Sequence, residues 1–235
     1  MTPAERPNTL LELSAAQRVS MLLANALPLA HLAATLTLAF WPGLGTWWRV
    51  SSVLGMLYLL PPLACRAVKM ALKPEEGRVA VGSRSFFAWW LMLQTQVVFV
   101  RLPFLEEVIR FVPGLYSAWL RAWGSRIGRL TYWAAGLTIL DRAYLDIGDD
   151  VVFGAGVRLN PHVLQSEADG TWLYLGTIRI GSKASIGGYA LLSAGCEIEP
   201  NEQTHAFLIL PPFTRWQGGR RSREFRRMAA EARQA

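Results

Sequence analysis

Apolar residues dominate the first hundred positions of this 235-residue chain. From Val19 to Trp48 no residue carries a formal charge, and residues 19–41 are long enough as a helix to cross a hydrocarbon core of about 30 Å. The pattern predicts one transmembrane helix over 19–41 and a second, ending in basic residues, over 50–71. Positive charge flanks the outer ends of this pair, so both ends are predicted to lie in the cytoplasm.

Two weaker apolar segments follow. Residues 86–100 lie between two arginines and are short for a span, so they are predicted to form an interfacial or re-entrant helix. From 104 to 123, apolar residues recur at roughly helical spacing around a break at Pro113 and Gly114, which predicts an amphipathic bridge. We therefore expect a membrane domain over residues 1–123.

From Gly124 onward the hydrophobic pattern changes to a period of six. An aliphatic or aromatic residue opens each hexad, and a small or branched residue often follows four places later; the openers are Ile127, Trp133, Ile139, Ile147, Phe153, Leu159, Ile180, Ile186, Leu192 and Ile198. Short strands joined by turns and stacked as a solenoid explain this period, whereas a helix or a hairpin does not. Glycines at the second hexad position are expected to permit unusual backbone angles. The pattern predicts about three coils and fails at Glu202.

Residues 165–179 interrupt the hexad register and are predicted to protrude as a loop. The repeat domain is expected over 124–219, followed by a basic tail helix over 220–235. This tail holds much of the formal net charge of +7, which favours attraction to anionic lipids or to an acidic carrier protein. No motif supports nucleic-acid binding. Cys65 and Cys196 indicate neither a disulfide framework nor a metal site, and both are predicted to be buried.

Two stretches of the repeat carry a family resemblance. Ile147-Gly-Asp-Asp-Val-Val-Phe-Gly-Ala-Gly-Val-Arg and Ile180-Gly-Ser-Lys-Ala-Ser-Ile-Gly-Gly-Tyr-Ala resemble the left-handed β-helix acyltransferases. Ala122-Trp-Gly-Ser-Arg-Ile-Gly, Asn160-Pro-His-Val-Leu and Pro211-Pro-Phe-Thr-Arg-Trp-Gln-Gly are similar to the membrane-tethered repeat domains at the C-termini of polylysine-synthetase-type peptide synthetases. The resemblance implies a membrane-anchored fold of helices followed by a left-handed parallel β-helix that assembles as a homotrimer.

The resemblance also implies a general base at a coil edge, and His162 stands directly before the predicted loop. An imidazole titrates near neutrality and is suited to that task. Glu167 and Asp169 are candidates to orient the ring, and Asn160 is a candidate either to bind substrate or to cap a coil turn. The candidate substrate-binding residues, each with packing or solvation as the alternative role, are Trp172, Tyr174, Arg179, Lys183, Arg215 and Trp216. His205 is the rival base.

The predicted function is an acyltransferase at a bacterial-type inner membrane, with the repeat domain in the cytoplasm. It is expected to move an acyl or aminoacyl group from a thioester to a hydroxyl or amine. The donor is expected to be acyl-CoA or a phosphopantetheine carrier protein, with no permanently bound cofactor and no metal. Membrane lipid and two further copies of the chain are the expected partners. The alternative is a non-catalytic, membrane-bound trimeric scaffold of a biosynthetic complex.

Overall fold

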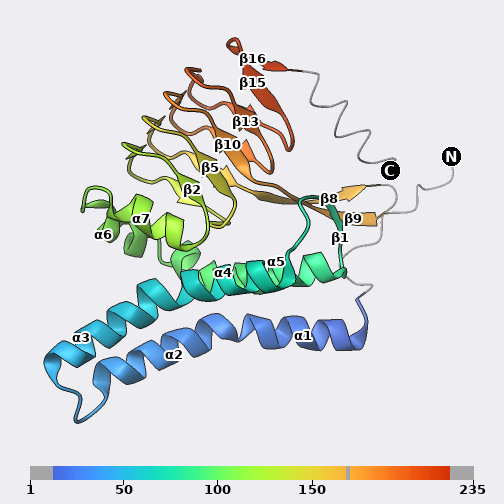
Figure 1. The fold of residues 1–235 in the computed structure, drawn as a ribbon. Helices are drawn as coiled ribbons and strands as arrows, with labels where there is room; N and C mark the ends of the chain where they lie inside the picture. Colours follow the sequence, from blue (N-terminus) through green and yellow to red (C-terminus); the bar gives the residue numbers. More distant parts are fainter. Residues whose placement is uncertain (1–12, 168–169, 223–235) are drawn as a thin grey trace.

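A long helical hairpin carries a stack of short strands in the computed structural model, which describes residues 13–167 and 170–222 (Figure 1). The helices are α1 (Ala15–Asn25), α2 (Leu27–Phe40), α3 (Thr46–Leu54), the π-helical turn η2 (Gly55–Leu59), α4 (Leu60–Leu72), α5 (Arg84–Arg101), α6 (Phe104–Arg110) and α7 (Leu115–Ala122). Two continuous stretches, Ala15–Phe40 and Thr46–Leu72, are long and apolar enough to cross a membrane by length and composition. They overlap the two predicted spans and are candidate membrane helices.

Proline interrupts the second arm of this hairpin. Pro61 and the proline after it begin α4, and proline has no amide hydrogen to give to the carbonyls of the preceding turn. The carbonyl oxygen of Met56 accepts instead from His31 Nε2 at 2.8 Å, and that of Tyr58 accepts from Trp119 Nε1 at 2.9 Å. A side chain of α2 and a side chain of α7 therefore complete the hydrogen bonding of this arm.

Helix α5 lies beside α4 and beneath the coiled strands (Figure 1). Its fully covered side chains include Phe86, Trp89, Met92, Gln96 and Phe99. A helix over the predicted segment 86–100 is therefore present, but its apolar side chains pack inside the protein, against α4 and the coil base, where an interfacial or re-entrant helix had been expected. The expected break at Pro113 and Gly114 separates α6 from α7.

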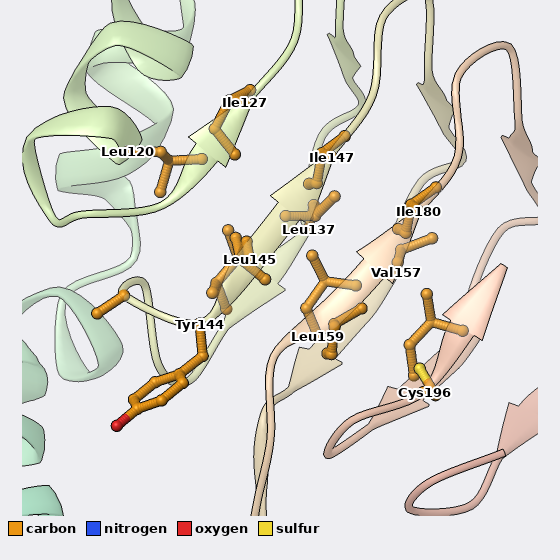
Figure 2. Packing of buried hydrophobic residues seen from close by; sticks show 14 of the residues in the cluster. Leu120, Ile127, Leu137, Tyr144, Leu145, Ile147, Val157, Leu159, Ile180 and Cys196 are labelled. Carbon is orange, nitrogen blue, oxygen red and sulfur yellow. The ribbon is translucent and has the colours of Figure 1, made fainter. Parts of the chain in front are cut away.

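The repeat region forms a parallel β-helix. Its strands are β2 (Arg126–Ile127), β3 (Tyr132–Trp133), β4 (Thr138–Ile139), β5 (Leu145–Ile147), β6 (Val152–Phe153), β7 (Arg158–Asn160), β10 (Ile178–Ile180), β11 (Ser185–Ile186), β12 (Leu191–Ser193), β13 (Glu197–Ile198), β14 (Ile209–Leu210) and β15 (Arg215–Gln217). They form three parallel sheets, in the orders β15-β13-β10-β5-β2, β11-β6-β3 and β14-β12-β7-β4. Figure 2 shows the apolar column inside, which includes Leu137, Ile147, Val157, Leu159 and Cys196.

The stack has a fourth coil where three were predicted. β14 pairs with β12, β15 pairs with β13, and Ser185 bridges Gln203. The hydrophobic pattern hid this coil because buried threonines fill inward positions: Thr204 accepts from Gly187 N at 2.9 Å, and Thr214 donates to Pro211 O at 2.7 Å.

The charge that ended the predicted repeat has a separate explanation. The carboxylate oxygens of Glu202 accept the amide hydrogens of Gly218 at 2.6 Å and of Gly219 at 3.0 Å. The glutamate therefore caps the turn after β15, and the coil continues past it.

The repeated glycines are needed for space rather than for backbone angle. A Cβ on Gly148 would lie 2.5 Å from Ser182 N in the next coil, and one on Gly181 would lie 2.3 Å from Pro200 N. The left-handed angles fall on other turn residues, including Asp150, Lys183 and Asn201. The expectation that second-position glycines supply unusual angles was therefore wrong; they let one coil approach the next closely.

A β-hairpin leaves the coil at the predicted interruption, although it begins earlier than residue 165. Strands β8 (His162–Glu167) and β9 (Gly170–Leu175) pair antiparallel, and β1 (Gly77–Ala80), which follows α4, adds to β9. The chain returns to the coil at β10. At the other end, Arg220–Ser222 form β16, antiparallel to β15, so the tail does not begin as a helix at residue 220; its remainder, 223–235, lies outside the described residues.

Both cysteines are buried, as predicted. Cys65 of α4 and Cys196 of the coil are each 0% exposed. Cys196 contributes to the apolar column in Figure 2.

Candidate active site

His162 lies where the chain leaves the second coil to enter the hairpin. Its Nδ1 contacts Oδ2 of Asp141, and the side chains are 16% and 1% exposed, respectively. Asp141 belongs to the turn between β4 and β5. A carboxylate only accepts hydrogen bonds, so this contact keeps a proton on Nδ1 and leaves Nε2 as the nitrogen that can accept a proton from another group.

Trp89 of α5 holds this pair from the other side. Its Nε1 donates to Oδ1 of Asp141 at 3.0 Å, and its ring meets the imidazole of His162 edge to face, with centroids 4.7 Å apart. Both oxygens of the buried carboxylate are therefore hydrogen-bonded, which is what a buried charge requires. The ring of His162 is held by one hydrogen bond to Asp141 and one aromatic contact with Trp89.

The electrostatics favour a cationic imidazole. Burial lowers the pKa of His162, but the charge of Asp141 and its hydrogen bond together outweigh burial, and the pKa of His162 lies above its ordinary value. Asp141 therefore stabilises the proton that His162 would carry after acting as a base.

Asn160 ends β7, two residues before His162. Its Oδ1 is buried and has no hydrogen-bond partner within the described part of the chain. No bond from this oxygen caps the coil turn, and the oxygen is an unpaired buried acceptor two residues from His162.

The hairpin acid does not contact the imidazole. Glu167 accepts from the Tyr174 hydroxyl through Oε1 and from Arg78 Nη2 through Oε2, the latter at 2.7 Å. Arg78 of β1 also stacks 3.8 Å above the ring of Trp172. These contacts attach the hairpin to β1 through Glu167, Trp172 and Tyr174. The carboxylate that contacts His162 is that of Asp141. Asp169 lies outside the described residues.

The remaining candidates lie on the coil. Arg179 and Arg215 share Glu197, at 3.5 and 2.7 Å, and Trp216 is a core residue of β15 whose Nε1 donates to Gln203 O at 3.2 Å. Lys183 occupies a left-handed turn position. His205 is exposed, and its Nδ1 lies 2.9 Å from the next carbonyl oxygen, of Ala206. In residues 13–167 and 170–222, no three His, Cys, Asp or Glu side chains gather as a metal site would require.

A buried polar network continues from the Asp141 turn. Gln96 Oε1 accepts from the backbone N of Arg142 at 2.6 Å, and Arg142 Nε donates to Glu106 at 3.0 Å. Glu106 also accepts from the hydroxyl of Tyr116 on α7. Helices α5, α6 and α7 thereby hold the turn that contains Asp141 in place.

Sequence reasoning did not find Asp141 or Trp89. Asp141 lies in the interval from Ile139 to Ile147, which is two residues longer than a hexad because of the extra pair Leu145 and Asp146, and this longer interval was the available signal. Trp89 is 52 positions from Asp141 and belongs to an apolar segment, where nothing distinguishes it from a core tryptophan.

Comparisons with known proteins give distant structural likeness. No family model and no curated protein matches the chain. Similar solved structures include a maltose O-acetyltransferase from Clostridium difficile 630, at 17% identity and TM-score 0.39, over 53% of this chain and 82% of that one. A hexapeptide-repeat acetyltransferase from Vibrio cholerae O1 biovar eltor, complexed with acetyl coenzyme A, matches at 18% identity and TM-score 0.37, over 55% and 88%. A galactoside acetyltransferase in complex with coenzyme A matches at 17% and 0.33, over 55% and 82%.

Proposed function

We propose that this chain is a membrane-anchored acyltransferase with His162 as its general base. The observation that carries the proposal is the buried Asp141 carboxylate on Nδ1 of a partly exposed imidazole, at the point where the repeat opens into a hairpin. A positioned histidine with an orienting carboxylate is an arrangement suited to activating a nucleophile.

In the proposed reaction a single proton is transferred twice, first to His162 and then to the leaving thiolate. Nε2 of His162 takes the proton of an acceptor hydroxyl or amine as that oxygen or nitrogen attacks the carbonyl carbon of a thioester. The carbon–sulfur bond then breaks, and the departing thiolate takes the proton from the imidazolium. Asp141 stabilises the imidazolium between these steps. Asn160, with its unpartnered buried oxygen, is proposed to accept a hydrogen bond from the acceptor.

The donor is proposed to be an acyl-CoA or an acyl or aminoacyl group on a phosphopantetheine carrier, consumed as substrate. The hairpin β8–β9 begins at His162 and is proposed to form one wall of the donor site. The coil and the ends of the membrane hairpin are proposed to face the cytoplasm, where such thioesters occur.

Three copies of the chain are proposed to assemble through their coils, which we infer to be left-handed. The coil exposes several large apolar side chains: Leu130, Tyr132, Val152, Tyr189, Phe207 and Ile209. Tyr189 and Phe207 stack at 5.3 Å on consecutive coils and form an apolar surface that association would cover.

The test is thioester turnover by the full chain in mild detergent. Purified protein is incubated with acetyl-CoA or with an aminoacyl carrier protein, together with membrane lipids or a polyamine, and release of free thiol is followed alongside product mass. We expect acceptor-dependent thiol release that disappears when His162 is replaced. Thiol release equal in wild type and His162→Ala overturns the assignment and favours the scaffold.

A further inference from the structure

Each arm of the helical hairpin is divided into two halves at about the same level. Ala26 separates α1 from α2, with a proline in the first turn of α2, and Pro61 marks the start of α4 after η2. We call α1 and α4 the proximal half, and α2, α3 and η2 the distal half. His31 of α2 bonds Met56 of η2 across the distal half, so the two distal arms pair with each other.

The proximal half packs on protein that faces water. Gln17 of α1 donates to Gly82 O at 2.9 Å, and Lys69 of α4 donates to Ala143 O at the coil base at 2.5 Å. The same end of the coil carries the side chains of Arg126 and Arg129, each 86% exposed. A bilayer that enclosed the proximal half would also have to accommodate these charges and the coil backbone, which hydrocarbon does not tolerate.

Both halves expose large apolar side chains, among them Leu22, Leu23 and Leu63 in the proximal half, but the distal half carries less charge. Between Leu27 and Leu59, Arg49 is the single charged residue. Large apolar side chains point outward on both arms, among them Leu29, Phe40, Trp47, Trp48 and Leu59. Arg49 donates to the carbonyl oxygens of Trp41 at 3.3 Å and Leu44 at 3.1 Å, so its guanidinium is bonded to the backbone of the tip, and its Nε has no partner among the described residues.

An exposed apolar stripe, which we call the α6 stripe, runs from α6 through the turn after it to the first residue of α7, beside the division. It consists of Phe104, Val108, Phe111, Val112 and Leu115, all of them exposed apolar residues. Its helix is tied to the distal half by the Tyr58 hydroxyl, which donates to Leu105 O at 3.0 Å. A cluster of exposed apolar side chains next to an inserted segment is suited to the interface of a bilayer.

We propose that the distal half alone enters the bilayer, as a re-entrant loop that leaves on the side it entered, while the α6 stripe rests in the interface of that leaflet. The lengths support this geometry: α2 has 14 residues, and α3 and η2 have 9 and 5. At about 1.5 Å per residue each arm reaches about 21 Å, short of a hydrocarbon core of about 30 Å. The proposal concerns membrane contact and is independent of acyl transfer.

Cysteine labelling of the full chain in sealed phosphatidylcholine–phosphatidylglycerol vesicles tests the loop. Gly45→Cys places a thiol at the tip, where φ is −60° and the space is open. Met70→Cys places one on the exposed side of α4, and Arg126→Cys, on the coil, reports the fraction of molecules whose coil faces outward. Wild type is the blank, because both native cysteines are buried.

A membrane-impermeant maleimide outside the vesicles should label Met70→Cys as fully as Arg126→Cys. Gly45→Cys should resist reagent both outside and trapped inside, and react once detergent is added. Labelling of Gly45→Cys from inside would establish full crossing, and labelling from outside would establish that the loop is not inserted. Protection of Met70→Cys would place the proximal half in the bilayer. Each of these three results overturns the proposal.

The stripe has its own readout. An environment-sensitive fluorophore on Phe111→Cys should shift to the blue when these vesicles are added, whereas the same fluorophore on Ile209→Cys, in the last coil, should not. Equal shifts at the two positions, or no shift at Phe111→Cys, would remove the stripe from the membrane contact.

Discussion

The indole of Trp89 hydrogen-bonds the carboxylate of Asp141 at 3.0 Å, across 52 positions of the chain. Trp89 belongs to α5, which packs on the hairpin helix α4, and Asp141 contacts His162 at the coil edge. The position of the His162 ring therefore depends on how α4 and α5 pack against the coil. Three of the predictions below address this chain of contacts.

Replacement of His162 by alanine should reduce acyl-transfer turnover about 10²- to 10⁴-fold, because proton transfer by a positioned side chain contributes about that much. Donor binding should persist, since the imidazole acts on the acceptor. The assay is thiol release near neutral pH, where an amine acceptor is mostly protonated and needs a base. His205→Ala is the matched control, because His205 is an exposed histidine of the same coil region, and its turnover should stay near wild type.

Replacement of Asp141 by asparagine should move the pH dependence of kcat/KM. The base form of His162 is the deprotonated one, so activity should rise with pH through the raised pKa of His162 in wild type. Asparagine removes the charge that raises the pKa and leaves burial, which lowers it. The inflection should therefore fall to lower pH, even as maximal turnover drops. An inflection that stays in place would mean that Asp141 does not govern the titrating group.

Replacement of Trp89 by phenylalanine should have the opposite effect on the same profile. Asp141 loses a donor, so its carboxylate holds the imidazolium proton more strongly, and the inflection should rise. The free energy of unfolding should fall by about 1–3 kcal/mol, because a buried acceptor is left unpaired. Urea unfolding and a pH profile measure the two effects. Trp90→Phe is the control: it loses an exposed bond to Asn25 and should leave the profile unchanged.

The sequence predicted the coil and the candidate base, but not the carboxylate that contacts that base. A period of six is a local property, so the hexads from Ile127 to Ile198 predicted a stacked solenoid, and the strand pairing confirms a parallel one. The fourth coil was not predicted because Thr204 and Thr214 occupy inward positions. Hydrogen bonds satisfy these polar side chains there, so the hydrophobic pattern does not mark the coil.

Long-range contacts explain the errors at the site. Glu167 was a reasonable partner for His162 by proximity along the chain, yet Arg78, 89 positions away, holds it on the hairpin. Asp141 reaches the imidazole because two successive coil edges stack, and Trp89 reaches Asp141 because α5 packs beneath them. Stacking and docking of this kind follow from tertiary structure, which residue spacing does not encode.

The buried pair between Arg142 and Glu106 gives a stability prediction. Their side chains are 1% and 5% exposed, so Glu106→Gln leaves a buried guanidinium without its countercharge. Loss of one member of such a pair costs about 3–5 kcal/mol in unfolding free energy. Glu107→Gln removes a more exposed ion pair to Arg110 and should cost about 0–1 kcal/mol. Urea denaturation in detergent compares the two variants, and equal losses would contradict the burial argument.

Association through the coils should depend on the stacked pair Tyr189 and Phe207. Asparagine tolerates their left-handed backbone angles, so Tyr189→Asn with Phe207→Asn removes apolar area without straining the turns. Mass measurement in mild detergent should show a trimer for wild type and a monomer for the double variant. A wild-type monomer that turns over thioester would contradict the proposed trimer.

The prolines at the start of α4 also affect the order in which the hairpin acquires its hydrogen bonds during synthesis. When a ribosome has released only the helical hairpin, the carbonyl of Tyr58 still lacks the indole of Trp119, which lies 61 residues further along the chain. His31, by contrast, precedes Met56 and can bond its carbonyl as soon as the two arms meet. In the nascent hairpin the carbonyl of Met56 can therefore already be hydrogen-bonded, whereas the carbonyl of Tyr58, which will face α7, is not. The hydrogen bonding of the hairpin is completed only when α7 has been synthesised and packs beside η2, just before the first strand of the coil.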